Sequence, residues 1–168
     1  MRLTSEISQL IVDEYNEHVN SMYSGKTKEE RQELDQFFTP PTLTVRLLEK
    51  FNKDTLSDQV ILDPTSGSGN LLAACLIAGA DSDKVFGNEL DSVMVKICRE
   101  RLNKVCDLLG KPHINDWQIH RGDATDSFCL TYFGPDYKQK LEEHFLADQH
   151  SLFPMLTKDQ EEFLKEVD

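Results

Sequence analysis

The most informative part of the sequence reads Val60-Ile61-Leu62-Asp63-Pro64-Thr65-Ser66-Gly67-Ser68-Gly69-Asn70-Leu71-Leu72. Three β-prone apolar residues lead into Asp63, a turn of small residues follows, and a second apolar run has helical character. The pattern predicts a strand, a tight loop and a helix. Gly67 and Gly69 let the loop backbone pass close to a ligand, and the following helix begins with unpaired N–H groups. Because ligands of open α/β sheets bind at such strand ends, we expect a nucleotide-like molecule here.

The loop lacks the residues that phosphate-binding loops need. A phosphate loop requires Gly-Lys-Ser or Gly-Lys-Thr, and neither occurs in the chain. The dinucleotide fingerprint needs a third glycine at the position of Leu72, and the Asp63 carboxylate would repel a pyrophosphate. S-adenosylmethionine (SAM) has no phosphate and carries an ammonium group, so it fits an acidic loop better. The alternative is a plain strand-to-helix connection, which has no need for Asp-Pro and two glycines.

Two motifs resemble those of SAM-dependent DNA adenine-N6 methyltransferases. Residues 63–69 resemble the SAM-binding motif, and Gln36-Phe37-Phe38-Thr39-Pro40-Pro41 resembles the Phe-Thr-Pro motif of type I modification subunits. The resemblance covers roughly residues 34–125 and corresponds to the N-terminal, SAM-binding half of such a protein. It implies an α/β, Rossmann-like SAM-methyltransferase fold. It also implies methyl transfer from SAM to an adenine amino group, as in the DNA methylation of restriction-modification systems.

The resemblance also implies which residues bind the cofactor. Asp63 and the loop glycines would hold the methionine end of SAM. Phe38, Thr39 and Pro40 would form a cap over that end; the alternative is an aromatic pair buried below a proline turn. Glu89 ends the predicted strand Val85–Glu89 about twenty residues after Gly69, the offset at which an acid binds ribose hydroxyls. Asp123 follows a predicted third strand at Trp117–His120 and would accept from the adenine amino group, or be a turn aspartate. The predicted cofactor-binding set is Phe38, Thr39, Pro40, Asp63, Pro64, Thr65, Gly67, Gly69, Asn70, Glu89, Leu90, Asp123 and Ala124.

The catalytic tetrapeptide of the family, Asn/Asp/Ser-Pro-Pro-aromatic, does not occur in the sequence. In those enzymes the polar side chain and a proline carbonyl accept hydrogen bonds from the target amine, and the aromatic ring stacks on the flipped base. The nearest sequence is Gly134-Pro135-Asp136-Tyr137, after a weak strand pattern at 126–133. Asp136 and Tyr137 are therefore the candidate catalytic residues, as substitute acceptor and stacking platform. The alternative is an ordinary turn.

The chain divides into three predicted parts. Residues 1–35 form an N-terminal helical segment that includes an amphipathic helix at 4–19, residues 36–137 form the SAM-binding α/β domain, and residues 138–168 form an acidic helical tail. The 31 residues of the tail are too few for three more strands of a seven-stranded sheet. We therefore expect a truncated methyltransferase fold with an open sheet edge, covered by the tail or by another subunit.

The charge of the chain is strongly negative. It has 168 residues with 18 basic and 30 acidic side chains, which give a formal net charge of −12. Affinity for DNA comes largely from Lys and Arg neutralising phosphates, so this chain would reach DNA only through a partner or a second copy. A homo-oligomer or a subunit of a methyltransferase complex is the expected assembly. The alternative is that the negative charge serves only to keep the protein soluble.

The predicted helix from Ser92 to about Leu109 has Asp91 as its N-cap and Gly110 as its stop. Its basic residues Lys96, Arg99, Arg101 and Lys104 are expected to form a solvated face.

The four cysteines, Cys75, Cys98, Cys106 and Cys129, show no Cys-x-x-Cys pair and are expected to be buried, reduced thiols. The histidines show no metal-ligand spacing, so no metal site is predicted. With no signal peptide or membrane-length apolar run in view, a cytoplasmic protein is expected.

The sequence leaves several functions open. The first is a methyltransferase that a partner or a second copy completes. The second is a catalytically inactive SAM-binding decoy or regulatory subunit of a methyltransferase or restriction-modification complex. A remnant that no longer binds SAM is the third, and a SAM enzyme that acts on protein or a small molecule also fits.

Overall fold

The computed structural model describes residues 3–24, 39–50, 56–125, 136 and 139. Phe38, Cys129, Tyr137, the possible strand at 126–133 and nearly all of the predicted tail therefore lie outside the described residues. Two short 3-10 helices, Ser82–Lys84 and Asp116–Gln118, precede the second and third strands. The other elements, in chain order, are α1 (Ser5–Met22), α3 (Pro41–Lys50), β1 (Ile61–Asp63), α4 (Asn70–Ile77), β2 (Val85–Glu89), α5 (Ser92–Leu109) and β3 (Ile119–Arg121).

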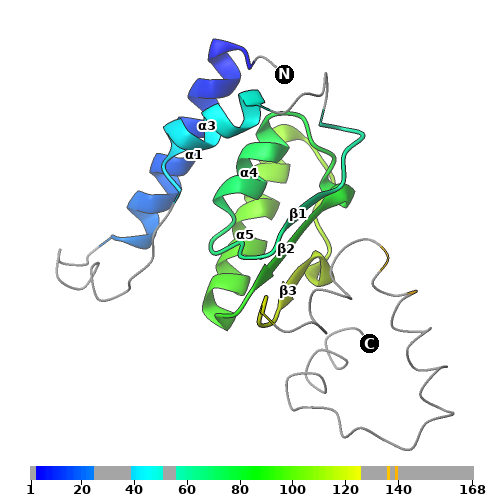
Figure 1. Cartoon of the computed structure of the whole chain (residues 1–168). Helices are drawn as coiled ribbons and strands as arrows, with labels where there is room; N and C mark the ends of the chain where they lie inside the picture. Colours follow the sequence, from blue (N-terminus) through cyan, green and yellow to red (C-terminus); the bar gives the residue numbers. More distant parts are fainter. Residues whose placement is uncertain (1–2, 25–38, 51–55, 126–135, 137–138, 140–168) are drawn as a thin grey trace, which may run out of the picture.

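The three strands form one parallel sheet in the order β1-β2-β3 (Figure 1). In the register of the sheet, Asp63 lies opposite Gly87, and Glu89 lies opposite Arg121. A parallel sheet brings the carboxyl ends of its strands to one edge. The acidic residues that end β1 and β2 and follow β3 therefore lie together at the carboxyl-terminal edge of the sheet. The predicted α/β class and the order of strands and helices are confirmed.

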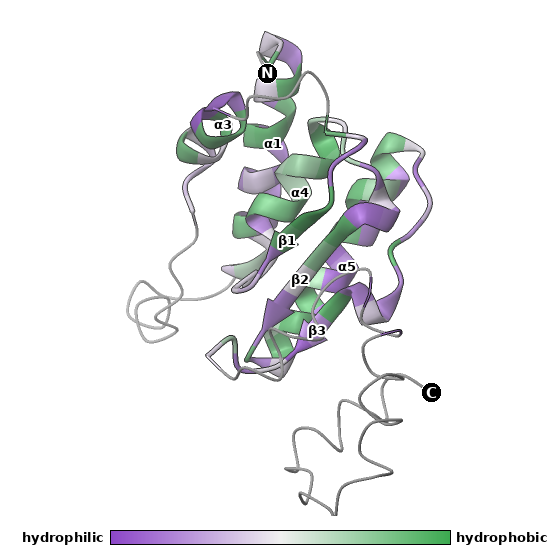
Figure 2. Ribbon diagram, turned by 45° about the vertical axis from the view of Figure 1, so that its right-hand side comes forward, coloured by the Kyte–Doolittle hydropathy of each residue, from purple (hydrophilic) through white to green (hydrophobic). Residues whose placement is uncertain are grey.

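Helix α4 lies at the centre of the hydrophobic core. All of its residues from Leu72 to Ile77 are buried, and Figure 2 shows the helix almost wholly in the hydrophobic colour. It contacts β1, β2, α1, α3 and α5, so one short apolar helix joins the sheet to the other helices. It spans only eight residues. No helix in the described part of the chain is long and apolar enough to cross a membrane.

Helix α1 confirms the amphipathic pattern predicted for residues 4–19. Thr4 is its N-cap, and the Ile7 N–H donates to the Thr4 hydroxyl at 3.2 Å. Ile11 is only 3% exposed and belongs to the same core cluster as α4. Figure 1 shows α1 and α3 side by side next to α4. The N-terminal helix is therefore part of the folded core.

Helix α5 begins and ends as its sequence predicts. The Asp91 carboxylate accepts from the Val93 N–H at 2.7 Å, and Gly110 closes the helix in the left-handed conformation with φ of 63°. The cysteines of the described residues, Cys75, Cys98 and Cys106, are buried and free, which confirms the prediction for these three. Burial raises the pKa of Cys75 and of Cys98 to about 12, so both thiols stay protonated.

The third strand is shorter than predicted. Asp116–Gln118 forms a 3-10 turn, and only Ile119–Arg121 pairs with β2. The Gln118 side chain accepts from the Asn115 N–H at 2.8 Å, which closes a capping box over this turn. It also donates to the carbonyls of Ser82 and Val85, at 2.7 and 2.9 Å. Alternating apolar residues indicated a strand through Trp117, but these side-chain bonds favour the turn.

The lateral edge of the sheet at β1 and part of one face are open in the described structure. Among the described residues β1 pairs with β2 alone, and Val60 and Leu62 are 50% and 49% exposed. An open strand edge offers unpaired N–H and C=O groups, and proteins normally cover such edges. The expectation that the acidic tail or another subunit covers this edge stays a prediction.

The buried His120 and the half-buried His18 should make the fold sensitive to acid. Burial, together with the charge of Arg99, lowers the pKa of His120 to about 4, and burial with the charges of Arg101 and Lys104 does the same to His18. Unfolded histidines titrate near pH 6.5. As the pH falls below about 6.5 the unfolded chain takes up protons first, so stability present above that pH is lost toward pH 4.

We expect the free energy of unfolding, measured by urea denaturation, to be about 2 kcal/mol lower at pH 5 than at pH 7 from His120 alone. His113 is the matched control, because its ring is exposed and paired with Asp107. His113→Gln should keep the decline, whereas His120→Gln should reduce it. Equal stability of the unmodified chain at pH 5 and pH 7 would contradict this reading.

Candidate cofactor site

Three acidic residues stand where the three strands end. Asp63 is the last residue of β1, Glu89 is the last residue of β2, and Asp123 lies two residues beyond β3. Backbone bonds tie the loops that carry them to one another. The Ser66 N–H donates to the Asn88 carbonyl at 2.8 Å, and the Gly122 N–H donates to the Glu89 carbonyl at 3.0 Å. The predicted acids of the cofactor site are thus brought to one edge of the sheet.

The loop between β1 and α4 needs both of its glycines. Gly67 has φ of 53° and Gly69 has φ of 83°, a region that residues with a Cβ adopt only with strain. A Cβ on Gly69 would lie 2.7 Å from the Cys98 sulfur of α5, so the loop passes directly over that helix. A Cβ on Gly67 would meet nothing within 4 Å. Gly69 therefore faces the protein, whereas a Cβ on Gly67 would point into open space.

The Glu89 carboxylate fixes the glycine loop. One oxygen accepts from the Gly67 N–H at 2.8 Å, and the other accepts from the Asp91 N–H at 3.0 Å. The N–H that a phosphate would need is thus occupied by a carboxylate, which supports the exclusion of a phosphate ligand. A carboxylate has about four acceptor positions, so both oxygens keep capacity for hydroxyl donors.

Asn88 in β2 joins the loops that follow β1 and β3, a role that was not predicted from the sequence. Its side-chain amide donates to the carbonyls of Pro64 and Gly122, at 3.1 and 2.9 Å. Its oxygen accepts from Nδ1 of His120 at 2.9 Å. Asn88 is 2% exposed, so these bonds are shielded from water. The available signal was a polar residue inside the apolar strand run Val85–Glu89, because a buried amide must find partners.

Asp63 has the electrostatic character of a site for a cation. Its carboxylate accepts from the Thr65 N–H at 3.2 Å. Burial raises the pKa of Asp63, the Thr65 amide opposes that rise, and the neighbouring Glu89 carboxylate adds to it. Two carboxylates that repel each other at a partly buried edge are stabilised by a positively charged group between or beside them. The ammonium group of an amino acid has this character.

Asp123 and its neighbours form the outer part of the site. Asp123 is exposed, and its carboxylate accepts from the N–H and the hydroxyl of Thr125, at 2.8 and 2.7 Å. These two bonds lower the pKa of Asp123. Leu90 is 64% exposed beside Glu89, while Ala124 is half-buried. An exposed leucine next to a polar strand end offers an apolar surface to a ring.

Thr39, Pro40 and Asp136 make no hydrogen bond to this edge among the described residues. Thr39 and Pro40 lie directly before α3, where the Pro40 carbonyl accepts from the N–H groups of Leu43 and Thr44. Asp136 is exposed in a turn. Phe38 and Tyr137 lie outside the described residues, so the cap and the catalytic pair stay predictions.

The expectation of a solvated face was wrong for Arg101. Its side chain is only 4% exposed, and it bonds Glu14 of α1 on one side and Ser68 and Asn70 on the other. The signal was its helical spacing, since Arg101 falls three residues after Cys98 and four before Val105, both on the buried side of α5. Arg99 is also half-buried and donates twice to the Ile119 carbonyl.

The described residues form an α/β domain whose parallel sheet and acid-edged glycine loop are compatible with the Rossmann-like fold of methyltransferases. A comparison with known families agrees with this class. The chain belongs to the N-6 DNA methylase family, whose sequence model matches residues 9–125. The chain is therefore related to N6 DNA methyltransferases over residues 9–125, which include the predicted region 34–125 and extend it toward the N-terminus.

One relative extends the comparison. The type II methyltransferase M.VspI of Vibrio sp. (strain 343) is 30% identical to this chain over 94 residues. The matched segment is 56% of this chain and 21% of that enzyme, so the chain corresponds to about a fifth of its relative's length. The relative is called a type II enzyme, so the particular likeness to type I modification subunits stays a prediction.

Proposed function

We propose that this chain is the SAM-binding part of a DNA adenine-N6 methyltransferase. One observation carries the proposal: Glu89 holds the Gly67 N–H while Asp63 and Asp123 stand at the neighbouring strand ends. That edge offers carboxylates to an ammonium group and to hydroxyls, and it offers no free loop amide at Gly67 to a phosphate. The family to which the chain belongs generally uses SAM, and the residues present fit that molecule.

Each residue of the edge has a proposed part in holding SAM. Asp63 binds the ammonium of the methionine end, and the Cβ-free space at Gly67 admits the chain of that end. Glu89 accepts from the ribose hydroxyls with its remaining acceptor positions. Asp123 accepts from the adenine amino group, against which Leu90 and Ala124 provide apolar contact. When bound, SAM supplies a methyl group activated by the sulfonium charge.

Methyl transfer requires more than the described residues provide. The target amine needs acceptors that hold it in line with the methyl group. The family tetrapeptide that supplies them is absent from the sequence, and Asp136 with Tyr137 is its proposed substitute. The net charge of −12 also opposes contact with DNA by this chain alone. In this proposal a partner or a second copy completes the active site and brings the DNA.

A second candidate is a catalytically inactive SAM-binding decoy or regulatory subunit, since these 168 residues contain no match to the family tetrapeptide. The two are separated by transfer of labelled methyl from SAM to unmethylated DNA, with and without the chains that copurify with this one. Label in DNA that disappears with Asp136→Ala supports the enzyme and its substitute acceptor. SAM binding without label under either condition excludes the enzyme and leaves the decoy.

The raised pKa of Asp63 gives the proposal a pH dependence. The ammonium of SAM pairs with the ionised carboxylate, so affinity should be full well above that pKa and should decline as the pH falls through it. Asp63→Asn should bind SAM at least about tenfold more weakly and without this decline. Asp123→Asn is the matched control, because the pKa of Asp123 is lowered and the decline should persist. An unchanged affinity in Asp63→Asn would contradict the assigned role.

A further inference from the structure

Arg101 occupies an unusual position for a guanidinium group. It lies on α5 with 4% of its side chain exposed, between the N-terminal helix and the glycine loop. A buried charge of this kind is costly unless it is fully paired. Its five N–H donors are fixed in one plane, so the partners at the two ends of that plane are held at a set separation.

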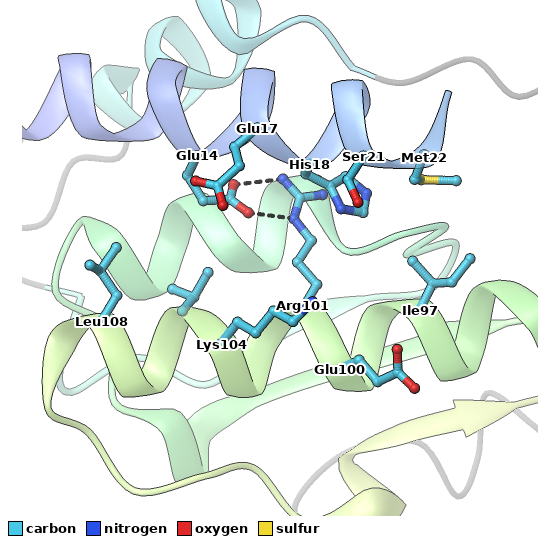
Figure 3. A pocket seen from close by; sticks show the side chains of 11 residues that line it. Glu14, Glu17, His18, Ser21, Met22, Ile97, Glu100, Arg101, Lys104 and Leu108 are labelled. Atoms are coloured by element: carbon cyan, nitrogen blue, oxygen red, sulfur yellow. Dashed lines mark hydrogen bonds and ion pairs between the residues drawn. The ribbon is translucent and has the colours of Figure 1, made fainter. Parts of the chain in front are cut away.

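On one side Arg101 grips helix α1. Nε donates to one oxygen of Glu14 at 2.7 Å, and Nη2 donates to the other at 2.6 Å, which makes a bidentate pair (Figure 3). The Glu14 side chain is 15% exposed, so the pair is shielded from solvent on both sides. Such short, two-pronged bonds between charged groups are among the strongest that side chains form.

On the other side Arg101 grips the glycine loop. Nη1 donates to the Ser68 carbonyl at 3.2 Å and to the side-chain oxygen of Asn70. Ser68 lies between the two loop glycines, and Asn70 is the first residue of α4. The Ser68 carbonyl shares a peptide plane with the Gly69 N–H, which donates to the Ser66 carbonyl at 2.8 Å. Arg101 therefore fixes the orientation of the peptide at the centre of the loop.

The packing around the Glu14–Arg101 pair bears on how α1 and the glycine loop are linked. A pocket of about 440 Å³ opens between α1 and α5 and is lined by Glu14, Glu17, His18, Arg101, Lys104 and Leu108, among others (Figure 3). The pocket thus lies between the second half of α1 and α5, whereas Ile11 in the first half of α1 is buried in the core. The Glu14–Arg101 pair spans this open region. A movement of α1 there is transmitted to Ser68 and Asn70 through one rigid group.

We propose that Arg101 is a positioning residue that makes the affinity for the methionine end of SAM depend on the docking of α1. The inference rests on the proposed function for its ligand, but the contacts themselves are independent of it. With Glu14 in place, the guanidinium is neutralised and holds the loop in its binding conformation. Without Glu14, an unpaired cation lies under the loop, and the loop loses its fixed partner. Helix α1 thereby controls the cofactor loop without touching the cofactor.

Two probes separate positioning from a general loss of structure. SAM carries the methionine end, whereas 5′-methylthioadenosine keeps the nucleoside and lacks the amino-acid end. In calorimetric titrations of the full chain, Glu14→Ala and Arg101→Lys should weaken SAM at least about tenfold and leave 5′-methylthioadenosine within about twofold. Lysine keeps the charge but lacks the planar fork of donors that bonds both oxygens of Glu14 and the Ser68 carbonyl in one fixed geometry. Glu14→Gln, which keeps an acceptor, should give an intermediate loss.

Glu17→Ala is the matched control. It removes the same charge from the same helix and the same pocket, and among the described residues Glu14, not Glu17, bonds the guanidinium. Its affinities for both probes should equal those of the unmodified chain. Equal weakening of both probes in Glu14→Gln, or unchanged SAM affinity in Glu14→Ala and Arg101→Lys, would overturn the inference.

Amide hydrogen exchange distinguishes this inference from the proposed function. If the unmodified chain binds no SAM, the proposed function fails, and the link is decided by exchange at Gly67–Asn70 alone. Faster exchange there in Glu14→Gln, with exchange in β2 unchanged, supports the link. Unchanged exchange in the loop, or a uniform rise across loop and strand, rejects it. The glutamine variant retains the shape of Glu14, so it serves even where Glu14→Ala does not fold.

Discussion

Replacing Asn88 with alanine is expected to lower the free energy of unfolding by about 3 kcal/mol, because the buried Asn88 side chain loses three hydrogen bonds of about 1 kcal/mol each. The amide joins the carbonyls of Pro64 and Gly122 to the ring of His120. Pro64 and Gly122 lie on the loops after β1 and β3, and His120 lies in β3. The same change should therefore abolish SAM binding at temperatures where the chain stays folded. Urea denaturation and calorimetric titration measure the two effects.

Asn103→Ala is the matched control for this prediction. The Asn103 side-chain oxygen accepts a single bond, from the Ile114 N–H at 2.9 Å, away from the glycine loop. Its loss should cost about 1 kcal/mol and leave SAM affinity unchanged. Equal losses in the two variants would show that the Asn88 network carries no special weight in joining the loops.

Replacing Gly69 with alanine should cost about 2–4 kcal/mol of unfolding free energy, from roughly 1 kcal/mol of left-handed strain and about 1–3 kcal/mol of overpacking. The added Cβ would lie 2.7 Å from the sulfur of Cys98, which is fully buried. The loop must then lift from α5. SAM affinity should fall with the stability, because Gly67 and Ser68 move with it.

Three related variants separate the two causes. Gly110→Ala at φ of 63° has no neighbour within 4 Å of the new Cβ, so it should show the strain of about 1 kcal/mol without overpacking. Gly67→Ala, which also meets nothing within 4 Å, should cost a similar amount but weaken SAM binding. Adding Cys98→Ala to Gly69→Ala removes the clashing sulfur. The double variant should then lose less unfolding free energy than the sum of the losses in the two single variants. Strict additivity would contradict the proposed clash.

The parts of the fold that local pattern determines could be read from the sequence. The apolar run before Asp63, the N-cap at Asp91 and the stop at Gly110 each act within one turn or one strand, and each was found where predicted. The turn at Asp116–Gln118 was missed because the partners of Gln118 include Ser82 and Val85, more than thirty residues earlier. Alternation in the sequence carries no information about such distant acceptors.

The acids of the site could be predicted because strand ends and glycine loops have a recognisable pattern. The residues that support these acids could not be predicted in the same way. Asn88 and Arg101 act through residues on other elements, and only the fold brings Glu14 to Arg101 or Gly122 to Asn88. A helix rich in lysine and arginine is usually solvated on its charged face. The Arg101 side chain instead points into the protein, as its helical spacing among apolar residues indicated.

The central claim is that this sheet edge binds a nucleoside with a cationic amino-acid end and rejects a phosphate. Calorimetric titration of the full chain with SAM, and with ADP under the same conditions, tests it most directly. We expect SAM to bind with one molecule per chain and ADP to give no binding heat. A chain that binds no SAM, or binds ADP as tightly as SAM, would contradict the claim.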